Sequence, residues 1–308
     1  MNVQNPSASR GIAIQAVDLV KNYGTGSNMV HALRGVNVSF ERGKFTAIMG
    51  PSGSGKSTLM HTLAGLDSAT SGHILFGGAD LTRMDDKQLT LLRRHKIGFI
   101  FQSFNLLPMF TAEQNILMPL TLAGDKPDRA WFDLLVETLG LKQRLNHRPN
   151  ELSGGQQQRV AIARALITKP KLVFADEPTG NLDSVSSAEV LGFLKRSVNE
   201  LGQTIVMVTH DAVAASYADR AIVFSDGRIV ADEQHPNAEV MNELLMAERE
   251  RTTRTTLTDT PADQMAQMAG VRNVPDLPIT DAPLPPAVPT SGCEGTLRHA
   301  RAVARHAR

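Results

Sequence analysis

The sequence predicts an α/β protein with a largely parallel sheet and an inserted helical subdomain. Between residue 12 and about residue 231, short apolar, β-favouring runs alternate with longer helical patterns, as is typical of parallel strands joined by helices. Between about Phe104 and Thr168 the strand signal is absent, and helical segments such as DRAWFDLLVETLGL follow one another. A helical subdomain at about 104–168 is therefore expected inside the α/β core.

Five short apolar runs are the candidate strands of the α/β part. Each contains β-branched or aromatic residues of the kind that favour strands. The five runs cover residues 36–40, 45–49, 97–101, 172–175 and 205–208. Further along, AIVFSDGRIVA places Asp226 and Gly227 between two alternating segments, which predicts a hairpin. The stretch NAEVMNELLMAERER then predicts a closing helix.

The end of the chain has a different composition from the rest. Every aromatic residue lies before residue 252, whereas prolines accumulate after it. A segment of this kind buries too little apolar surface to offset the entropy lost on ordering. We therefore expect a folded domain at 12–251, a flexible N-terminus at 1–11 and a disordered tail at 252–308.

Composition and charge limit the partners and the compartment. The chain has 32 Lys and Arg against 31 Asp and Glu, and a net charge of +1 creates no overall field that would attract nucleic acid. Its apolar runs are far shorter than the roughly 20 residues that cross a bilayer. No secretory signal pattern is visible, and the single cysteine, Cys293, excludes an internal disulfide framework. These features indicate the cytoplasm and a local site for any phosphate.

The strand at 45–49 leads into a glycine-rich loop and then into a helical segment. The loop has the pattern GxxxxGK[ST], which in this strand, loop, helix setting predicts a phosphate site. Its backbone N–H groups and the positive end of the next helix would surround a β-phosphate. Lys56 is expected to reach the β and γ oxygens, and Ser57 to ligate Mg²⁺. The predicted nucleotide-binding residues here are Gly50, Pro51, Ser52, Gly53, Ser54, Gly55, Lys56, Ser57 and Thr58.

Two more apolar strands end in polar residues, at the sheet edge where α/β proteins bind ligands. KLVFADEP ends in Asp176 and Glu177, and TIVMVTHD ends in His210. Asp176 is predicted to bind Mg²⁺ directly or through water. Glu177 is the candidate base, because a carboxylate there can polarise the water that attacks the γ-phosphate. His210 is predicted to hydrogen-bond that water or the γ-phosphate.

The segment LSGGQQQR has no hydrophobic residue after its first position, so it does not fill a core. Ser153 is expected to cap a helix that begins near Gln156, and the two glycines leave its first N–H groups uncovered, which makes a second anion-binding helix terminus. One chain thus carries two half-sites for phosphate, and a dimer in which each segment covers the partner's γ-phosphate is the economical arrangement. The residues of this signature segment are Leu152, Ser153, Gly154, Gly155 and Gln156.

The motifs GPSGSGKST, LSGGQ, LVFADE and His210 occur in the order and approximate spacing of ABC-transporter nucleotide-binding domains, which the chain resembles from residue 12 to about 249. The resemblance implies a P-loop NTPase core with an N-terminal antiparallel β region, and ATP hydrolysis with ATP and Mg²⁺. By the same resemblance, Tyr23 in KNYG stacks on adenine, and Gln102 after GFIF contacts the metal and the attacking water. Asp183 in GNLDS matches the D-loop aspartate at the dimer interface.

Two stretches, FQSFNLLP and DEPTGNLD, resemble the subgroup of MacB-type macrolide exporters, LolD-type lipoprotein-release ATPases and FtsE-type division proteins. This implies a peripheral subunit on the cytoplasmic face of the membrane that drives a separate permease, in export or extraction of a peptide, lipid, lipoprotein or drug. The alternative is an FtsE-like ATPase that controls a division or cell-wall complex. The sequence departs from the subgroup at Lys44 and in its long tail.

The expected partners are a transmembrane permease and a second ATPase subunit, either an identical copy or a different chain. Permease contact is expected near the start of the helical insertion, where Leu106, Leu107, Met109 and Phe110 either line a groove for a short permease helix or belong to the subdomain core. No specific nucleic acid is expected. ABC ATPases that act on DNA or the ribosome usually carry coiled-coil insertions or paired ATPase domains, and the sequence shows neither.

Overall fold

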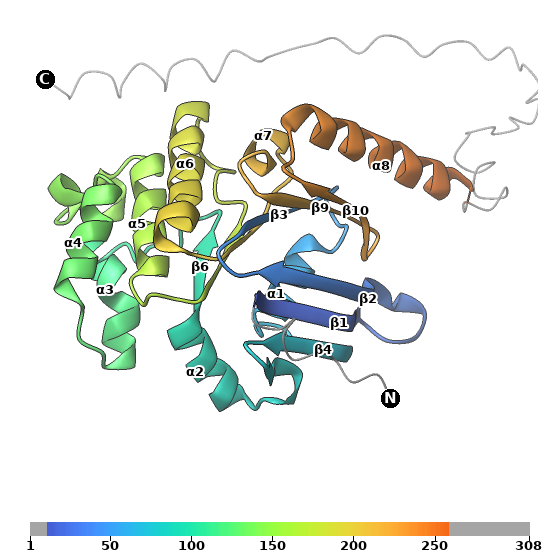
Figure 1. Cartoon of the computed structure of the whole chain (residues 1–308), viewed down its shortest axis with the longest axis horizontal. Coiled ribbons are helices and arrows are strands. Elements are labelled where there is room, and N and C mark those ends of the chain that lie inside the picture. Colours follow the sequence, from blue (N-terminus) through green and yellow to red (C-terminus); the bar gives the residue numbers. More distant parts are fainter. Residues whose placement is uncertain (1–10, 259–308) are drawn as a thin grey trace, which may run out of the picture. The chain divides into compact units, whose positions relative to one another are not determined.

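The computed structural model describes residues 11–258, and these form one unit built on two sheets (Figure 1). The predicted flexible N-terminus, and the predicted tail beyond residue 258, lie outside the described residues. The strands are β1 (Ile12–Tyr23), β2 (Val30–Glu41), β3 (Phe45–Met49), β4 (Ser71–Phe76), β5 (Ala79–Asp80), β6 (Ile97–Phe101), β7 (Leu172–Asp176), β8 (Ile205–Val208), β9 (Arg220–Ser225) and β10 (Arg228–Gln234). The helices are α1 (Lys56–Leu63), α2 (Asp86–Lys96), α3 (Ala112–Ala123), α4 (Arg129–Thr138), α5 (Gly154–Leu166), α6 (Ser184–Leu201), α7 (Ala212–Ala215) and α8 (Ala238–Thr258).

The larger sheet has the order β10-β9-β3-β8-β7-β6, and all its neighbouring strands are parallel except the β9–β10 hairpin. The predicted largely parallel sheet is therefore confirmed. The runs at 45–49, 97–101 and 205–208 match β3, β6 and β8 to the residue, and β7 extends one residue further, to Asp176. Because the strands are parallel, the ends of β3, β6, β7 and β8 that carry the predicted site residues lie at one edge.

The smaller sheet is antiparallel, with the order β2-β1-β4-β5. It confirms the expected N-terminal antiparallel region. The predicted strand at 36–40 is only the last part of β2, which begins at Val30. Val30 pairs with Tyr23, the last residue of β1, and the antiparallel pairing continues to Ile12 and Glu41. The first half of β2 is mostly exposed and has no apolar alternation, so it has no strong sequence signal; hydrogen bonding to β1 extends the strand.

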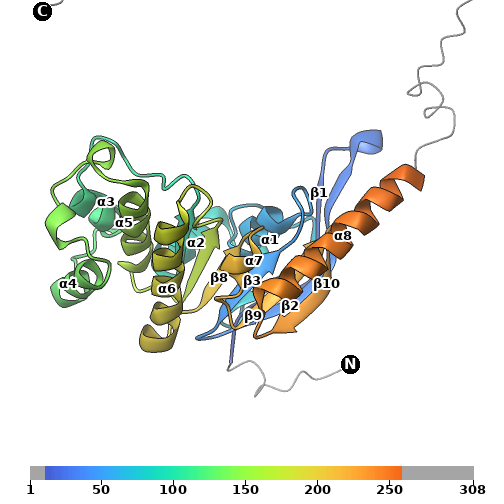
Figure 2. The same ribbon diagram turned by 90° about the horizontal axis from the view of Figure 1, so that it is seen from above.

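The parallel sheet separates two hydrophobic cores, and alternate residues of β3 point into them. Phe45, Ala47 and Met49 face a core shared with the helical subdomain and α6, whereas Ile48 faces a core shared with α1 and the antiparallel sheet. All five side chains of β3 are buried, as expected for a central strand covered on both sides. Figures 1 and 2 show α1 between the two sheets and α3, α4 and α5 grouped beyond β6.

The helical subdomain is made of α3, α4 and α5, in the predicted interval. The side chain of Asn115, fully buried in α3, fixes the loop that leads into this subdomain. Its Nδ2 donates to the carbonyls of Leu107, Phe110 and Thr111, and its Oδ1 accepts from the Leu107 N–H at 2.8 Å. A buried amide with this many partners holds a loop in one conformation.

The C-terminal part contains the predicted hairpin and closing helix. Asp226 and Gly227 form the turn between β9 and β10, both with positive φ, as a two-residue hairpin turn requires. Helix α8 runs to Thr258, so residues 252–258, which we expected to begin the disordered tail, are helical; the helical pattern of α8 simply continues through them. Within residues 11–258 no helix is sufficiently long and apolar to span a bilayer.

Candidate active site

Two glycines of the phosphate loop, which joins β3 to α1, leave no room for a side chain. Gly50 has φ 148°, and a Cβ built there would lie 1.9 Å from the carbonyl oxygen of Phe224 in β9. Gly55 has φ 103°, and its Cβ would lie 2.4 Å from the carbonyl oxygen of Ala32 in β2. Neighbouring strands thus press the loop backbone into a tight turn. This is the close backbone approach that a phosphate cradle needs.

The first turn of α1 points its N–H groups into the loop without a side-chain cap, because its N-cap residue is Gly55. The turn begins with Lys56, which is only 7% exposed and whose Nζ donates to the Pro51 carbonyl at 2.7 Å. Burial lowers the pKa of Lys56, while the charges of Glu177 and Asp176 raise it and partly offset burial. An uncapped helix terminus and a desolvated ammonium together attract an anion.

Part of this loop forms one wall of a hollow of about 590 Å³. Its walls are Gly53 to Thr58 on one side and Tyr23, Val30 and His31 of the β1–β2 hairpin on the other. Tyr23, 42% exposed, therefore borders the same hollow as the phosphate loop, and its stacking on adenine stays a prediction. The Ser54 hydroxyl is buried there and has no protein partner. A glycine cradle, an orphan hydroxyl and an aromatic wall fit a nucleoside triphosphate.

Ser57 and Asp176 supply the candidate metal ligands. The Ser57 Oγ lies 3.5 Å from the Asp176 Oδ1, at the end of β7. Burial raises the pKa of Asp176, and the nearby His61, with its Nε2 3.9 Å from Oδ2, opposes this effect. Among residues 11–258 no group of three or more His, Cys, Asp or Glu could hold a metal. One hydroxyl and one carboxylate fit Mg²⁺, which usually takes its other ligands from phosphates and water.

Glu177 and His210 lie together at the ends of β7 and β8. The Glu177 Oε1 and the His210 Nδ1 are 2.9 Å apart, and the Glu177 N–H donates to the Val208 carbonyl at 2.9 Å. Glu177 has φ 44°, a left-handed conformation that is strained for a side chain of this kind. Strain of this sort is retained where surrounding contacts fix a functional group. The structure thus brings the two predicted residues together, on the edge of a second hollow of about 650 Å³.

Gln102 follows β6 at the same sheet edge but contacts the D-loop, the GNLD segment at 180–183. Its Nε2 lies 3.5 Å from the Asn181 Oδ1, and the Asn181 Nδ2 donates to the Gln102 carbonyl at 3.0 Å. A Cβ on Gly180 would lie 2.6 Å from the Gln102 Nε2. The Gln102 amide thus packs on the D-loop, and its contact with the metal and the attacking water stays a prediction. Sequence reasoning missed Asn181, whose partner is remote in sequence.

The signature segment begins α5 two residues earlier than predicted, at Gly154. Ser153 is its N-cap and forms a capping box with Gln156. The Ser153 Oγ accepts from the Gln156 N–H, and the Gln156 Oε1 accepts from the Ser153 N–H. The two glycines differ in role. A Cβ on Gly155 would lie 2.9 Å from the Ser186 Oγ in α6, whereas the nearest atom to a Cβ on Gly154 would be the Leu182 Cδ2 at 3.5 Å. A side chain at Gly155 would therefore displace Ser186, whereas one at Gly154 would make only ordinary contacts.

Asp183 is the N-cap of α6. Its carboxylate accepts hydrogen bonds from the Val185 and Ser186 N–H groups and from the Ser186 hydroxyl. These bonds, that of the Ser186 N–H first, hold the pKa of Asp183 below its usual range. The predicted interface aspartate thus has a local structural task, which fixes the D-loop next to the signature segment.

The four residues expected to receive a permease helix are distributed differently. Leu106 packs against the core, Leu107 is 37% exposed and Met109 is 69% exposed. The apolar hollow in this region, about 480 Å³, lies instead between α2, β6 and α3, with Asn105 as its wall from the connecting segment. Leu106 thus belongs to the core, one of the two alternatives, and a groove at the other residues stays a prediction. The chain turns at Phe104 and Asn105, both with positive φ.

The buried Arg164 of α5 fixes that turn. Its Nη2 donates to the Phe104 carbonyl at 2.7 Å, and its Nη1 donates to the Asn105 carbonyl at 2.6 Å. Burial lowers the pKa of Arg164. Helix α5, which begins with the signature segment, therefore holds the segment that follows Gln102.

The fold and the site together define a P-loop nucleoside triphosphatase. The family model described as ABC transporter matches residues 33–180. The lipoprotein-releasing system ATP-binding protein LolD of Geobacter metallireducens is 49% identical over 221 residues, 71% of this chain and 98% of that protein. The macrolide export ATP-binding/permease protein MacB of Bdellovibrio bacteriovorus is 47% identical over 214 residues, 70% of this chain, which spans only 33% of that relative.

A solved structure gives the same answer for the fold. The dimeric ATP-binding cassette MJ0796, in a post-hydrolysis state with ADP and Pi, has a TM-score of 0.66 and 40% identity, and covers 73% of this chain and 99% of its own. The chain belongs to the ABC transporter family. It is an ATP-binding subunit that hydrolyses ATP, and its cofactor is Mg²⁺.

Proposed function

We propose that two copies of this chain close around two ATP molecules, and that the closed dimer drives a separate membrane permease. The observation that carries the proposal is the separation of two phosphate-binding features. Among the described residues, the lining of the phosphate-loop hollow includes none of the signature segment. The neighbours of Gly154 are Leu182, Asn181 and Phe104. A second chain is therefore needed to place a signature segment over the γ-phosphate.

The residue roles follow from the contacts around the loop. Lys56 and the backbone N–H groups of residues 50 and 52–58 hold the β- and γ-phosphates. Ser57 and Asp176 would hold Mg²⁺, which would neutralise charge on the phosphate oxygens. Glu177 polarises the attacking water, and the hydrogen bond from His210 orients its carboxylate. Water attacks the γ-phosphorus, the bond to the bridging oxygen breaks, and ADP and phosphate leave.

Gln102 links the metal site to the rest of the chain in this proposal. Its amide rests on Asn181, and Arg164 holds the following turn from within α5. Movement of Gln102 toward bound Mg²⁺ would therefore pull on the D-loop and on the signature helix together. ATP favours the closed dimer because the signature contact exists only there, and loss of the γ-phosphate weakens it.

The permease contact is proposed at the hollow between α2, β6 and α3. Phe99, Phe101 and Leu122 are among its walls, so it can receive a short apolar helix. A chain that uses it would work as a peripheral subunit on the cytoplasmic face of the membrane. The MacB relative, whose name joins ATP-binding and permease parts, supports the pairing with a permease.

The relatives also support transport over control of a division complex. Their names refer to lipoprotein release and macrolide export, so we propose an apolar or amphipathic cargo: a peptide, lipid, lipoprotein or drug. The permease, not this chain, would select that cargo.

Mixing two inactive variants tests the shared site. Lys56→Ala removes the phosphate-loop cation, and Ser153→Arg blocks the signature surface; each alone should hydrolyse ATP poorly. In a mixed dimer one site combines an intact phosphate loop with an intact signature segment, so activity should return on mixing, to about a quarter of wild type if sites act independently. Addition of Lys56→Ala to itself is the control. Activity of Ser153→Arg alone at the wild-type rate would contradict a site shared between chains.

A further inference from the structure

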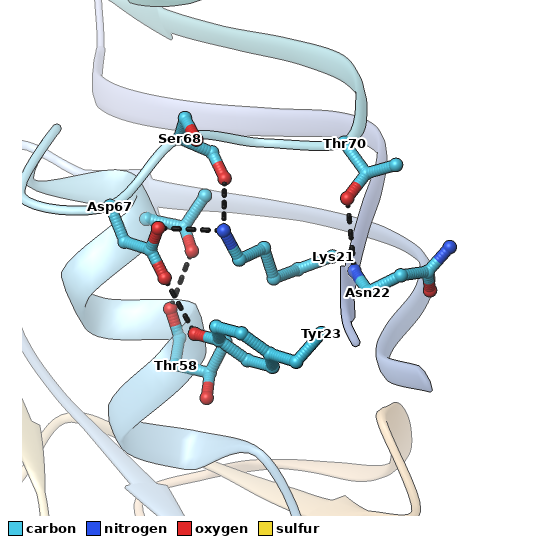
Figure 3. A network of polar contacts seen from close by, with 8 residues as sticks. Lys21, Asn22, Tyr23, Thr58, Asp67, Ser68 and Thr70 are labelled. Carbon is cyan, nitrogen blue, oxygen red and sulfur yellow. Dashed lines mark hydrogen bonds and ion pairs between the residues drawn. The ribbon is translucent and has the colours of Figure 1, made fainter. Parts of the chain in front are cut away.

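An ion pair between a buried lysine and a half-buried aspartate lies beside the ring of Tyr23 (Figure 3). Lys21, at the end of β1, is 7% exposed, and its Nζ donates to the Asp67 Oδ1 at 2.6 Å and to the Ser68 carbonyl at 2.8 Å. Neither Lys21 nor Asp67 belongs to a motif that binds phosphate. A buried ammonium of this kind needs a partner, and Asp67 satisfies it.

The second oxygen of the same carboxylate holds the tyrosine. The Tyr23 hydroxyl donates to the Asp67 Oδ2 at 2.5 Å, so one carboxylate joins the lysine and the phenol. Burial raises the pKa of Asp67, but hydrogen bonds from Lys21 and Tyr23 outweigh it, so the pKa lies below its usual range. The carboxylate is therefore charged at neutral pH and accepts a strong hydrogen bond from the phenol.

The ammonium also covers part of the ring. The Lys21 Nζ lies 4.7 Å from the centroid of the Tyr23 ring, within the range of a cation–π contact. Tyr23 remains 42% exposed, and it lines the hollow that contains the phosphate loop. The side of the ring that Lys21 leaves free is thus the one on which a flat ligand can stack.

Asp67 is itself fixed to the helix that follows the phosphate loop. Its N–H donates to the His61 carbonyl of α1 at 3.3 Å, and the Thr70 Oγ1 accepts from the Asn22 N–H at 2.9 Å. Figure 3 shows Thr58 of α1 beside the phenol. The tyrosine ring and the phosphate-binding residues of α1 are therefore held in one rigid group.

We infer that Asp67 and Lys21 are positioning residues for the nucleotide base. They hold the Tyr23 ring by its hydroxyl at a fixed distance from the phosphate loop, so that base and triphosphate can bind at the same time. This inference rests on the proposed stacking role of Tyr23. A half-exposed aromatic side chain that is not held in place loses rotational freedom when a ligand binds, which weakens binding. A ring that is already fixed avoids that loss.

The primary test is Tyr23→Phe, which keeps the ring and removes only the hydroxyl. Affinity for a non-hydrolysable ATP analogue should fall about three- to tenfold, the effect of immobilising one side chain on binding. Affinity for inorganic tripolyphosphate, which has no base, should not change. Asp67→Asn, which replaces the charged acceptor with a weaker neutral one, should weaken analogue binding in the same direction. In the Tyr23→Phe background it should cost less than it does alone, because the phenol hydroxyl is then absent.

Matched controls exist elsewhere in the chain. Tyr217→Phe makes the same change at the other tyrosine. Asp128→Asn breaks a similar Lys, Asp and aromatic set, because the Lys169 Nζ contacts Asp128 at 2.8 Å and lies 5.4 Å from the Trp131 ring centroid. Both controls should bind the ATP analogue as wild type does. Asp67→Asn leaves a buried ammonium poorly paired and can unfold the chain, and in that case Tyr23→Phe with its control decides.

Titration of Tyr23→Ala separates the inference from the role on which it rests. Unchanged affinity of Tyr23→Ala for the ATP analogue would overturn the stacking role itself. Weaker binding by Tyr23→Ala, with wild-type binding by Tyr23→Phe, would overturn the positioning inference alone. Equal weakening of ATP analogue and tripolyphosphate by Tyr23→Phe would also overturn it, because that pattern indicates general damage to the fold.

Discussion

The N-termini of α1 and α5 both bear glycines and both follow a motif that predicts phosphate binding, but they differ in how the chain surrounds them. The loop and terminus of α1 pack against strands β2 and β9. This terminus has no side-chain cap and begins with the buried Lys56. The terminus of α5 carries a complete capping box from Ser153 and Gln156, and Ser153 is exposed. The α1 terminus is thus an uncapped helix end packed against two strands, and the α5 terminus is a capped helix end at the surface.

This difference explains why the same motif chemistry serves two tasks. An uncapped terminus in an enclosed loop gains most from a bound anion, because the phosphate replaces the missing cap. A capped terminus already has hydrogen-bond partners within its own chain. It can therefore stay exposed at the surface, where the proposed partner's nucleotide would meet it. In the proposed dimer, each reaction centre combines the α1 terminus of one chain with the α5 terminus of the other.

The largest effect is expected from Gly50→Ala in the enclosed region. The new methyl group would meet the Phe224 carbonyl of a central strand, and neither backbone can move freely, so unfolding free energy should fall by about 3 kcal/mol or more. Gly53→Ala is the control for backbone strain alone: its φ of 79° disfavours a side chain, but apart from its chain neighbours no heavy atom of the described chain lies within 4 Å of its Cβ position. It should therefore cost less than Gly50→Ala. Denaturant titration measures both. A stable Gly50→Ala variant that still binds ATP would show that the cradle is not tightly enclosed.

A smaller, pH-dependent effect is expected where β3 begins. Asp219 accepts from the Phe45 N–H at 2.9 Å and from the Lys195 Nζ at 2.5 Å. Burial raises the pKa of Asp219, but these two hydrogen bonds outweigh it and hold the pKa below its usual value. The folded pKa is then lower than the unfolded value of about 3.9, so the stabilisation is present above that pH and is lost as pH falls through the folded pKa.

Asp219→Asn should therefore lower the unfolding free energy near pH 7 by about 1.5–3 kcal/mol, the value of hydrogen bonds to a charged group. The difference from wild type should shrink below about pH 3.9. Thermal or urea unfolding at several pH values checks both statements. A difference that grows in acid would reverse the assigned direction.

The smallest effect on stability is expected from the signature glycines. Gly155→Ala must displace the Ser186 side chain, which is a flexible contact, so it should cost about 1 kcal/mol. Gly154→Ala should leave stability nearly unchanged, yet it places a methyl group on the surface proposed to cover the partner's phosphate. Paired measurement of unfolding and ATPase activity separates the two. Loss of activity without loss of stability is expected only for Gly154→Ala.

Local patterns were sufficient to predict much of the fold and part of the site. The apolar run at 45–49 and the glycine pattern after it specify strand, loop and helix within a few residues, and Asp176, Glu177 and His210 follow strands that had to be parallel neighbours. The signature segment also predicted a helix capped by Ser153, although the helix begins at Gly154 instead of near Gln156.

Contacts between remote residues could not be predicted in this way. Asn181 meets Gln102 across 79 positions, and Asp67 meets Tyr23 across 44. Neither pair has a characteristic spacing, so only the folded chain reveals them. The same holds for Gly155, whose pattern indicates an exposed phosphate-binding glycine but which packs against Ser186 in the folded chain.

The central claim is tested most directly by the mass of Glu177→Gln in solution with ATP and Mg²⁺. The amide should slow hydrolysis by about 10²–10⁴-fold while ATP still binds, so the closed assembly should accumulate. Light scattering after size exclusion should then give twice the mass of one chain with ATP, and less with ADP. A variant that binds ATP to saturation and stays at the mass of one chain would contradict the account.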